Sequence, residues 1–107
     1  MADPNEAVDY IFKNGKKFAK AKAERIYLEE YRKSLKAILM KRSVENAIGA
    51  QERDAYAHDE YLALLQGLKA AVEVEEELRW ALIAAQARVE IWRSQEATNR
   101  VEGKVTI

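Results

Sequence analysis

Apolar residues recur with helical spacing in the first half of the chain. No proline or glycine occurs between residues 16 and 48. The main apolar positions of this stretch lie three and four residues apart, at Leu28, Tyr31, Leu35, Ile38 and Leu39. That spacing places them on one face of an α-helix. We therefore expect one long helix over about residues 16–48, whose apolar face fades toward its N-terminal end.

A second long apolar series fills the other half of the chain. It follows His58-Asp59-Glu60, where Asp59 is a candidate helix cap. Only Gly67 interrupts it, at a cost of roughly 1 kcal/mol relative to alanine. The series consists of Leu64, Leu68, Ala71, Leu78, Leu82, Ala85, Val89 and Trp92. The pattern predicts a helix over about residues 59–101.

The N-terminal segment has its own start and stop signals. Asp3 can cap a helix and Pro4 suits its first position. Asn14-Gly15 is the clearest break in the chain, because both residues tolerate turn conformations. We expect a short helix over about residues 4–13.

The two long helices are expected to form an antiparallel hairpin around residues 49–58. With Ile48 opposite Asp59, Glu75 falls within the apolar face and its opposite number is close to Arg32. A buried carboxylate without a partner is costly. The sequence therefore predicts that Glu75 pairs with Arg32 or accepts a hydrogen bond from the Tyr31 hydroxyl.

Apolar residues remain on the backs of both long helices. These candidate interface residues are Ile26, Met40, Val44, Ile48, Leu62, Trp80 and Ile91. One hairpin cannot cover both of its faces, and two helices alone give a thin core. Either helix 4–13 folds back over part of this surface, or the chain is a homo-oligomer, most simply a dimer forming a four-helix bundle.

Composition agrees with an all-α protein. The 107 residues, enough for one small helical domain, include four glycines and one proline, too few for an all-β fold. Cysteine is absent, which excludes disulfide scaffolds and thiol chemistry. The N-terminus lacks the pattern of a signal peptide, and no apolar run approaches the length of a membrane span. These features predict a cytoplasmic protein with no membrane partner.

Charge is balanced in total but not along the chain. Residues 13–42 contain eleven basic and three acidic residues, a net charge of +8. Residues 45–77 contain nine acidic and two basic residues, a net charge of −7. Antiparallel neighbours of opposite charge explain much of this polarity. This explanation accounts least well for the lysines that precede the main apolar positions, which begin at Leu28.

Those lysines are candidates for contact with nucleic-acid phosphates. The long donors near the end of the last helix are also candidates, because Arg79, Gln86, Arg93 and Arg100 recur every seven residues. The alternative for this second group is a solvated helix face with internal ion pairs. The candidate nucleic-acid-binding residues are Lys16, Lys17, Lys20, Lys22, Arg93 and Arg100.

Catalytic patterns are missing from the sequence. The single histidine, His58, lies at an expected helix boundary, where a capping or turn role is the ordinary one. No Glu-x-x-His metal motif and no glycine-rich phosphate loop occurs. We expect no catalytic residue, metal or cofactor, and therefore a protein that is not an enzyme.

Several short motifs in the second half resemble those of a known group of proteins. They are Tyr56-Ala57-His58, Glu60-Tyr61, Gly67-Leu68, Leu78-Arg79, Ala85-Gln86-Ala87-Arg88 and Trp92-Arg93-Ser94-Gln95-Glu96. Through them, Gln51–Arg100 resembles small helical proteins of tailed phages and prophages, and Arg25–Ala37 is also similar. The genes of that group tend to lie among genes for recombination and single-strand DNA handling. The resemblance implies phage DNA metabolism in a bacterial host, but it assigns no role to any residue.

These observations predict a non-enzymatic, oligomeric helical scaffold of a recombination or replication complex, which binds a protein or a nucleic acid. One alternative is a protein-only inhibitor of a host factor, whose acidic stretch 45–77 imitates phosphates. Another is a small structural or assembly component of a phage particle.

Overall fold

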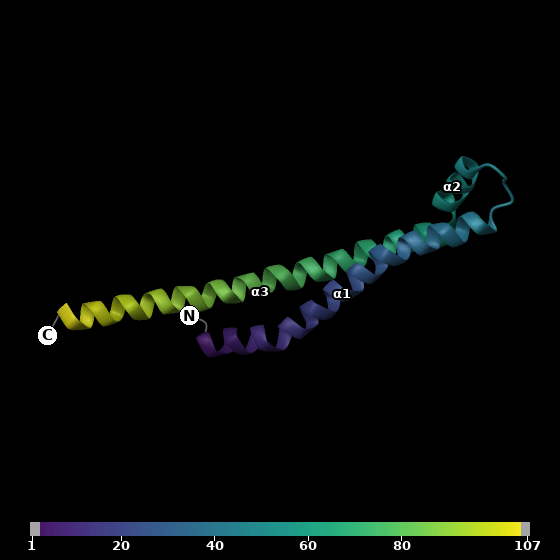
Figure 1. Ribbon diagram of the computed structural model, residues 1–107. Coiled ribbons are helices and arrows are strands. Elements are labelled where there is room, and N and C mark those ends of the chain that lie inside the picture. The colour runs from purple at the N-terminus through teal and green to yellow at the C-terminus, as the bar shows by residue number, and fades with distance from the viewer. Residues whose placement is uncertain (1–2, 106–107) are drawn as a thin grey trace. The chain divides into compact units, whose positions relative to one another are not determined.

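The computed structural model describes residues 3–105, and this part of the chain contains three α-helices and no strand (Figure 1). Helix α1 is Pro4–Arg42, α2 is Ile48–Ala57 and α3 is Asp59–Val105. The chain divides into two compact units. Unit 1 combines α1 up to Ala19 with α3 from Glu76, and unit 2 is Lys20–Glu75. The prediction of an all-α protein with two long helices is confirmed.

Helix α1 does not break at Asn14-Gly15, so the prediction of a separate short helix over residues 4–13 is wrong. Asp3 caps the helix, since its Oδ1 accepts a 2.9 Å hydrogen bond from the Asn5 amide. At the expected break, Asn14 Nδ2 donates to the Tyr10 carbonyl at 2.9 Å, and Gly15 keeps a negative φ. One glycine costs too little to end a helix whose cap is satisfied.

Replacing Gly15 by alanine is expected to stabilise the protein by up to about 1 kcal/mol, because glycine loses the most conformational entropy within a helix. A Cβ at Gly15 meets nothing within 4 Å, so no clash offsets the gain. The urea midpoint measures this change. Gly103→Ala, close to the end of α3, is the matched control and is expected to change the midpoint less. An unchanged midpoint for Gly15→Ala would show that α1 is not continuous there.

Helix α1 ends at Arg42 rather than at the expected residue 48. Residues 43–47 connect it to α2, which contains Ile48. Ser43 holds this connection, because its Oγ donates to Asp54 Oδ2 at 2.6 Å and accepts from the Glu45 amide at 3.1 Å. Ser43, Val44 and Asn46 are all weak helix formers, which is why α1 ends here.

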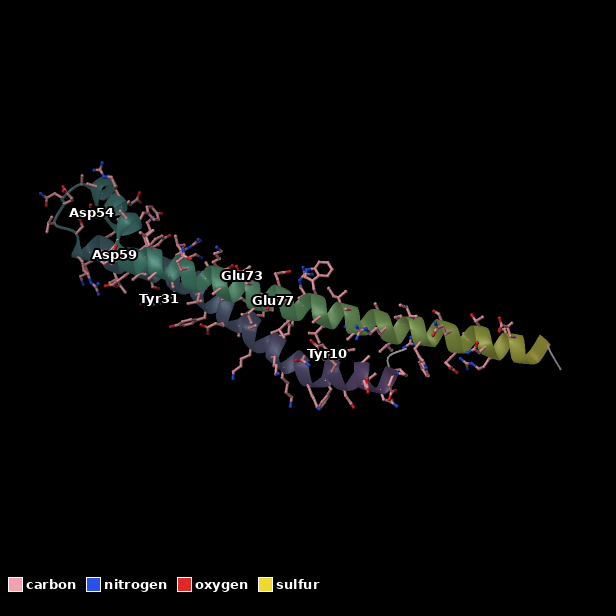
Figure 2. All side chains as sticks on the ribbon, turned by 180° about the vertical axis from the view of Figure 1, so that it is seen from behind. Tyr10, Tyr31, Asp54, Asp59, Glu73 and Glu77 are labelled. Atoms are coloured by element: carbon pink, nitrogen blue, oxygen red, sulfur yellow. The ribbon has the colours of Figure 1, made fainter. Side chains whose placement is uncertain are left out.

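Asp54 on α2 and Asp59 at the start of α3 lie at the same end of unit 2 (Figure 2).

His58 separates α2 from α3 and caps both. Its amide donates to the Ala55 carbonyl at the end of α2, at 3.2 Å. Its Nδ1 accepts from the Glu60 amide at 3.0 Å and so satisfies a free donor at the start of α3. The capping role expected for His58 is therefore confirmed, whereas Asp59 is the first residue of α3 and not its cap.

The core of unit 2 lies where α2 meets the two long helices (Figure 1). Its buried members are Leu35, Leu39, Ala55 and Tyr61, with Met40, Leu64 and Leu65 packed against them. Tyr61 also meets Tyr56 of α2 edge-on, with ring centroids 5.3 Å apart. Tyr31 and Ile38 are expected in the apolar face, but they still expose 38% and 40% of their surface. No large side chain among the described residues is fully buried.

The antiparallel packing of α1 and α3 within unit 2 has a different register from the expected one. Glu75 is buried, as predicted for a residue in the apolar face. Its partner is Arg25, whose Nε and Nη2 donate to the carboxylate at 2.7 and 2.9 Å, and not Arg32 or Tyr31. Arg42 meets Glu60 at 3.0 Å nearer the connection. Because α1 ends early, the facing positions shift by about two helical turns.

Removing the Arg25 guanidinium is expected to lower the midpoint of thermal unfolding by several degrees, because a buried carboxylate loses two charge-assisted hydrogen bonds. Arg25→Met keeps most of the side-chain length and deletes only the charge and donors. Arg32→Met is the matched control, since Arg32 is exposed. Circular dichroism melting of the two variants measures the difference. A larger loss for Arg32→Met would contradict the observed register.

The two long helices also pack within unit 1, through small residues. Ala7 and Ala85 are buried. A groove of about 410 Å³ opens beside them, lined by Glu6, Tyr10, Ala81, Ala84 and Arg88 as well. Phe18, Leu78, Leu82 and Val89 are half-buried. Small side chains fill little space, so the core of this unit is thin.

No helix within residues 3–105 is both long and apolar enough to cross a membrane.

Candidate functional site

Four lysines of α1 share one side of the helix. Lys13, Lys16, Lys17 and Lys20, here called the lysine face, are spaced three and four residues apart and are all exposed. Within the described residues none of them forms an ion pair. The ammonium of Lys16 lies over the exposed Phe12 ring, 5.5 Å from its centroid. Lys22 is exposed as well, but helical spacing places it on the opposite side of α1.

Three basic residues farther along α1 differ, because they lie close to acidic residues of unit 2, whereas Arg32 and Lys41 form no ion pair among the described residues either. Arg25 meets Glu75 and Glu29, Lys36 meets Glu52 at 3.5 Å, and Arg42 meets Glu60. The hydrogen bond to Glu75 is the main cause that raises the pKa of Arg25, so this guanidinium stays charged. Charge complementarity between helices therefore explains these residues, and it does not extend to the lysine face.

The environment of Lys36 links α1 to α2. Its ammonium lies 4.8 Å from the centroid of the Tyr56 ring. Interaction with the Tyr56 side chain is the largest cause that raises the pKa of Lys36, and Glu52 adds to it. A raised pKa in the folded state means that the charged form stabilises the fold below the ordinary value of 10.5. This contribution to stability is lost as the pH rises through the folded-state pKa of Lys36.

Sequence reasoning missed a pair of stacked tyrosines on α1. The rings of Tyr27 and Tyr31 are nearly parallel, with an interplanar angle of 7° and centroids 6.0 Å apart. Both side chains are exposed. Helical spacing places them on the same side of α1 as Lys20. The signal in the sequence is the four-residue spacing of two aromatic residues, but the apolar pattern places Tyr31 alone in the buried face.

The arginines near the end of α3 are engaged within their own helix. Arg93 pairs with Glu90 at 3.4 Å, and Arg79 pairs with Glu76 at 2.7 Å. Arg100 Nε donates to the Glu96 carbonyl at 3.4 Å. Arg93 and Arg100 nevertheless remain exposed. The structure therefore favours a solvated helix face for these two candidates.

Six of the seven candidate interface residues are exposed: Ile26, Val44, Ile48, Leu62, Trp80 and Ile91. Val44, in the connection after α1, exposes 93% of its surface, and Trp80 exposes 59%. Met40 differs, because it is half-buried against the core of unit 2. These six apolar side chains are thus uncovered in a single copy, whereas Met40 is packed.

The acidic stretch 45–77 is only partly used by internal pairs. Glu52, Glu60, Glu75 and Glu76 have basic partners. Glu73 and Glu77 project from α3 one turn apart (Figure 2), and neither forms an ion pair within residues 3–105. These two carboxylates form a small exposed acidic surface.

No group of three His, Asp or Glu side chains in the described part of the chain is arranged to hold a metal ion. No protein-family model matches the sequence, and no curated protein or solved structure is detectably similar to it.

Proposed function

We propose that this chain is a non-enzymatic helical interaction protein that self-associates and contacts a nucleic acid through the lysine face. The resemblance of Gln51–Arg100 to phage proteins suggests that it serves as an accessory component of a recombination or replication complex. In this function the long helices are the scaffold, and the charged face of α1 is the working surface.

The absence of ion-pair partners for Lys13, Lys16, Lys17 and Lys20 among the described residues supports the nucleic-acid contact most directly. Arg25, Lys36 and Arg42 of the same helix are instead paired with acidic residues of unit 2. Lysines aligned on one helix face match the repeated phosphates of a nucleic-acid backbone and bind them without reading sequence. The exposed Phe12 ring beside Lys16 adds an aromatic surface of the kind on which bases stack.

Self-association is supported by the apolar residues that a single copy leaves exposed. Eighteen large apolar side chains among the described residues are exposed, and Trp80, Ile83 and Ile91 share one side of α3. Soluble monomers rarely present extended apolar surfaces of this kind. Self-association would also place several lysine faces on one assembly, which raises affinity for a long phosphate backbone.

Fluorescence anisotropy tests the nucleic-acid contact. Labelled single- and double-stranded DNA oligonucleotides are titrated with the protein at ~50 and ~200 mM salt, because release of counterions makes such binding strongly salt-dependent. We expect binding at ~50 mM salt, with an affinity that falls at least about tenfold at ~200 mM salt. No binding at either salt concentration would overturn it.

Glu73 and Glu77 favour a second candidate function. Adjacent exposed carboxylates on a rigid helix can imitate phosphates toward a basic protein. In that case the chain inhibits a basic host factor and has no affinity for DNA. Capture of a basic protein by the wild type, lost in Glu73→Lys/Glu77→Lys, would support this candidate. Equal capture by the wild type and the variant would contradict it.

A further inference from the structure

Helix α3 carries a second apolar stripe within unit 1. The buried Ala85 and the half-buried Leu78, Leu82 and Val89 occupy one side of the helix. The other side carries five exposed apolar residues with a spacing of three and four, here called the α3 stripe: Trp80, Ile83, Ala84, Ala87 and Ile91. Ala84 lies at the edge of the stripe and also lines the groove beside Ala7 and Tyr10 of α1. Trp80 and Ile91, at the ends of the stripe, expose 59% and 55% of their surface. Scattered apolar residues need no explanation, but five at coiled-coil spacing indicate a helix-packing surface.

We propose that the α3 stripe packs antiparallel against the α3 stripe of a second copy, around a twofold axis between Ala84 and Ala87. This inference rests on the self-association in the proposed function and names the surface, the partner and its direction. A twofold interface uses the same patch on both copies, so the patch must be complementary to itself when reversed.

Four of the five residues of the α3 stripe meet that requirement, whereas Ile83 falls opposite Arg88 of the second copy. With the axis between Ala84 and Ala87, Trp80 of one copy lies opposite Ile91 of the other, and Ala84 lies opposite Ala87. Small residues at the centre allow the helices to approach closely, while the large side chains fill the ends. One turn beyond Trp80, Glu77 faces Ser94 of the second copy, whose hydroxyl can donate to the carboxylate. The stripe is therefore closed at both ends by polar layers.

The charged residues beside the stripe are also complementary to themselves when the helix is reversed. Glu76 and Glu90 lie beside the stripe on one flank of α3, and Arg79 and Arg93 lie on the same flank but farther from the stripe. Each arginine is paired with the acid three residues before it. Reversing the helix brings Arg79 beside Glu90 of the second copy and Glu76 beside Arg93. A parallel arrangement in register would instead place Glu beside Glu and Arg beside Arg. Opposite charges on the flanks of a helix pair set its direction, so this order selects the antiparallel arrangement.

Charge reversal across the axis tests the interface by sedimentation equilibrium of the full chain. In Arg79→Glu, acid faces acid at both symmetry-related contacts, and in Glu90→Arg, base faces base. Each single variant is expected to weaken dimerisation about tenfold, since two flanking ion pairs become repulsive. Residues 79 and 90 are about 16 Å apart along one helix, so they cannot pair within a copy.

The double variant Arg79→Glu/Glu90→Arg is the decisive control. It restores both contacts between copies. It also makes the pairs within each helix worse, because the new carboxylate at position 79 lies near Glu76 and the new guanidinium at position 90 lies near Arg93. Dimerisation is expected to return to nearly the wild-type level. An equimolar mixture of the two single variants is expected to form a heterodimer of similar stability. Circular dichroism confirms that each variant remains helical.

The direction of packing can be measured separately, because the chain has no cysteine. A spin label on Asn99→Cys would be about 40 Å from its counterpart in the antiparallel dimer, at 1.5 Å per residue, and below about 20 Å in a parallel one. A short distance, or single variants that dimerise like the wild type, would overturn the α3 interface while leaving self-association intact. A monomeric wild type would overturn the inference and the self-association, but not the nucleic-acid contact tested by anisotropy.

Discussion

Leu39→Ala is expected to reduce the free energy of unfolding by about 3 kcal/mol, a large part of what so small a core can supply. Leu39 exposes only 2% of its surface and belongs to the cluster in which Leu35, Ala55 and Tyr61 are also buried. These residues come from all three helices, so a cavity at Leu39 loosens the attachment of α2 as well as the hairpin. Urea denaturation followed by circular dichroism measures the loss.

Val44→Ala is the control, because it also truncates an aliphatic side chain to alanine but at an exposed position. Val44 exposes 93% of its surface, so its truncation is expected to change stability by less than about 0.5 kcal/mol in a single copy. Similar losses for Leu39→Ala and Val44→Ala would mean that the cluster around Leu39 is not the core. The comparison should be made at low protein concentration, where association of copies contributes least.

Reversing two charges of the lysine face is expected to weaken DNA binding at least about tenfold at ~50 mM salt. In Lys17→Glu/Lys20→Glu, two cations that contact phosphates become anions that repel them. The salt dependence of the affinity should also fall by about one per lysine removed. Both side chains are exposed and have no ion pair among the described residues, so the helix itself should tolerate the change. Anisotropy titrations at several salt concentrations measure both quantities.

Lys33→Glu/Lys41→Glu is the matched control for the lysine face. It changes the net charge equally and also lies on exposed positions of α1. If the lysine face is the contact surface, this variant should lose much less affinity than Lys17→Glu/Lys20→Glu. Equal losses would show that net charge alone attracts the DNA and that no particular face of α1 is used.

The helices were predictable because their signals are redundant. Good helix formers, apolar residues three and four apart, and an Asp3-Pro4 start all favour the same local structure. The burial of Glu75 followed from the same periodicity. The boundaries were less predictable. Asn14-Gly15 has the composition of a break, yet the Asn14 side chain donates to the Tyr10 carbonyl and the helix continues.

The partner of Glu75 could not be read from the sequence because it depends on where α1 ends. The end at Arg42 is marked by neither proline nor glycine. Placing the end of α1 too late therefore changes which residues of α1 and α3 are predicted to face each other. The candidate site shows the same limit. The lysines were recognisable as a charged face, but whether they have partners depends on what the fold places opposite them. The stacking of Tyr27 on Tyr31 was likewise hidden by assigning Tyr31 to the buried face.

The most direct test of the account is the mass of the protein, measured by light scattering alone and in the presence of a single-stranded DNA oligonucleotide at ~50 mM salt. We expect an even multiple of 12.2 kDa for the protein alone, and a heavier complex when DNA is added. A protein that remains at 12.2 kDa with and without DNA would contradict both the self-association and the working surface assigned to α1.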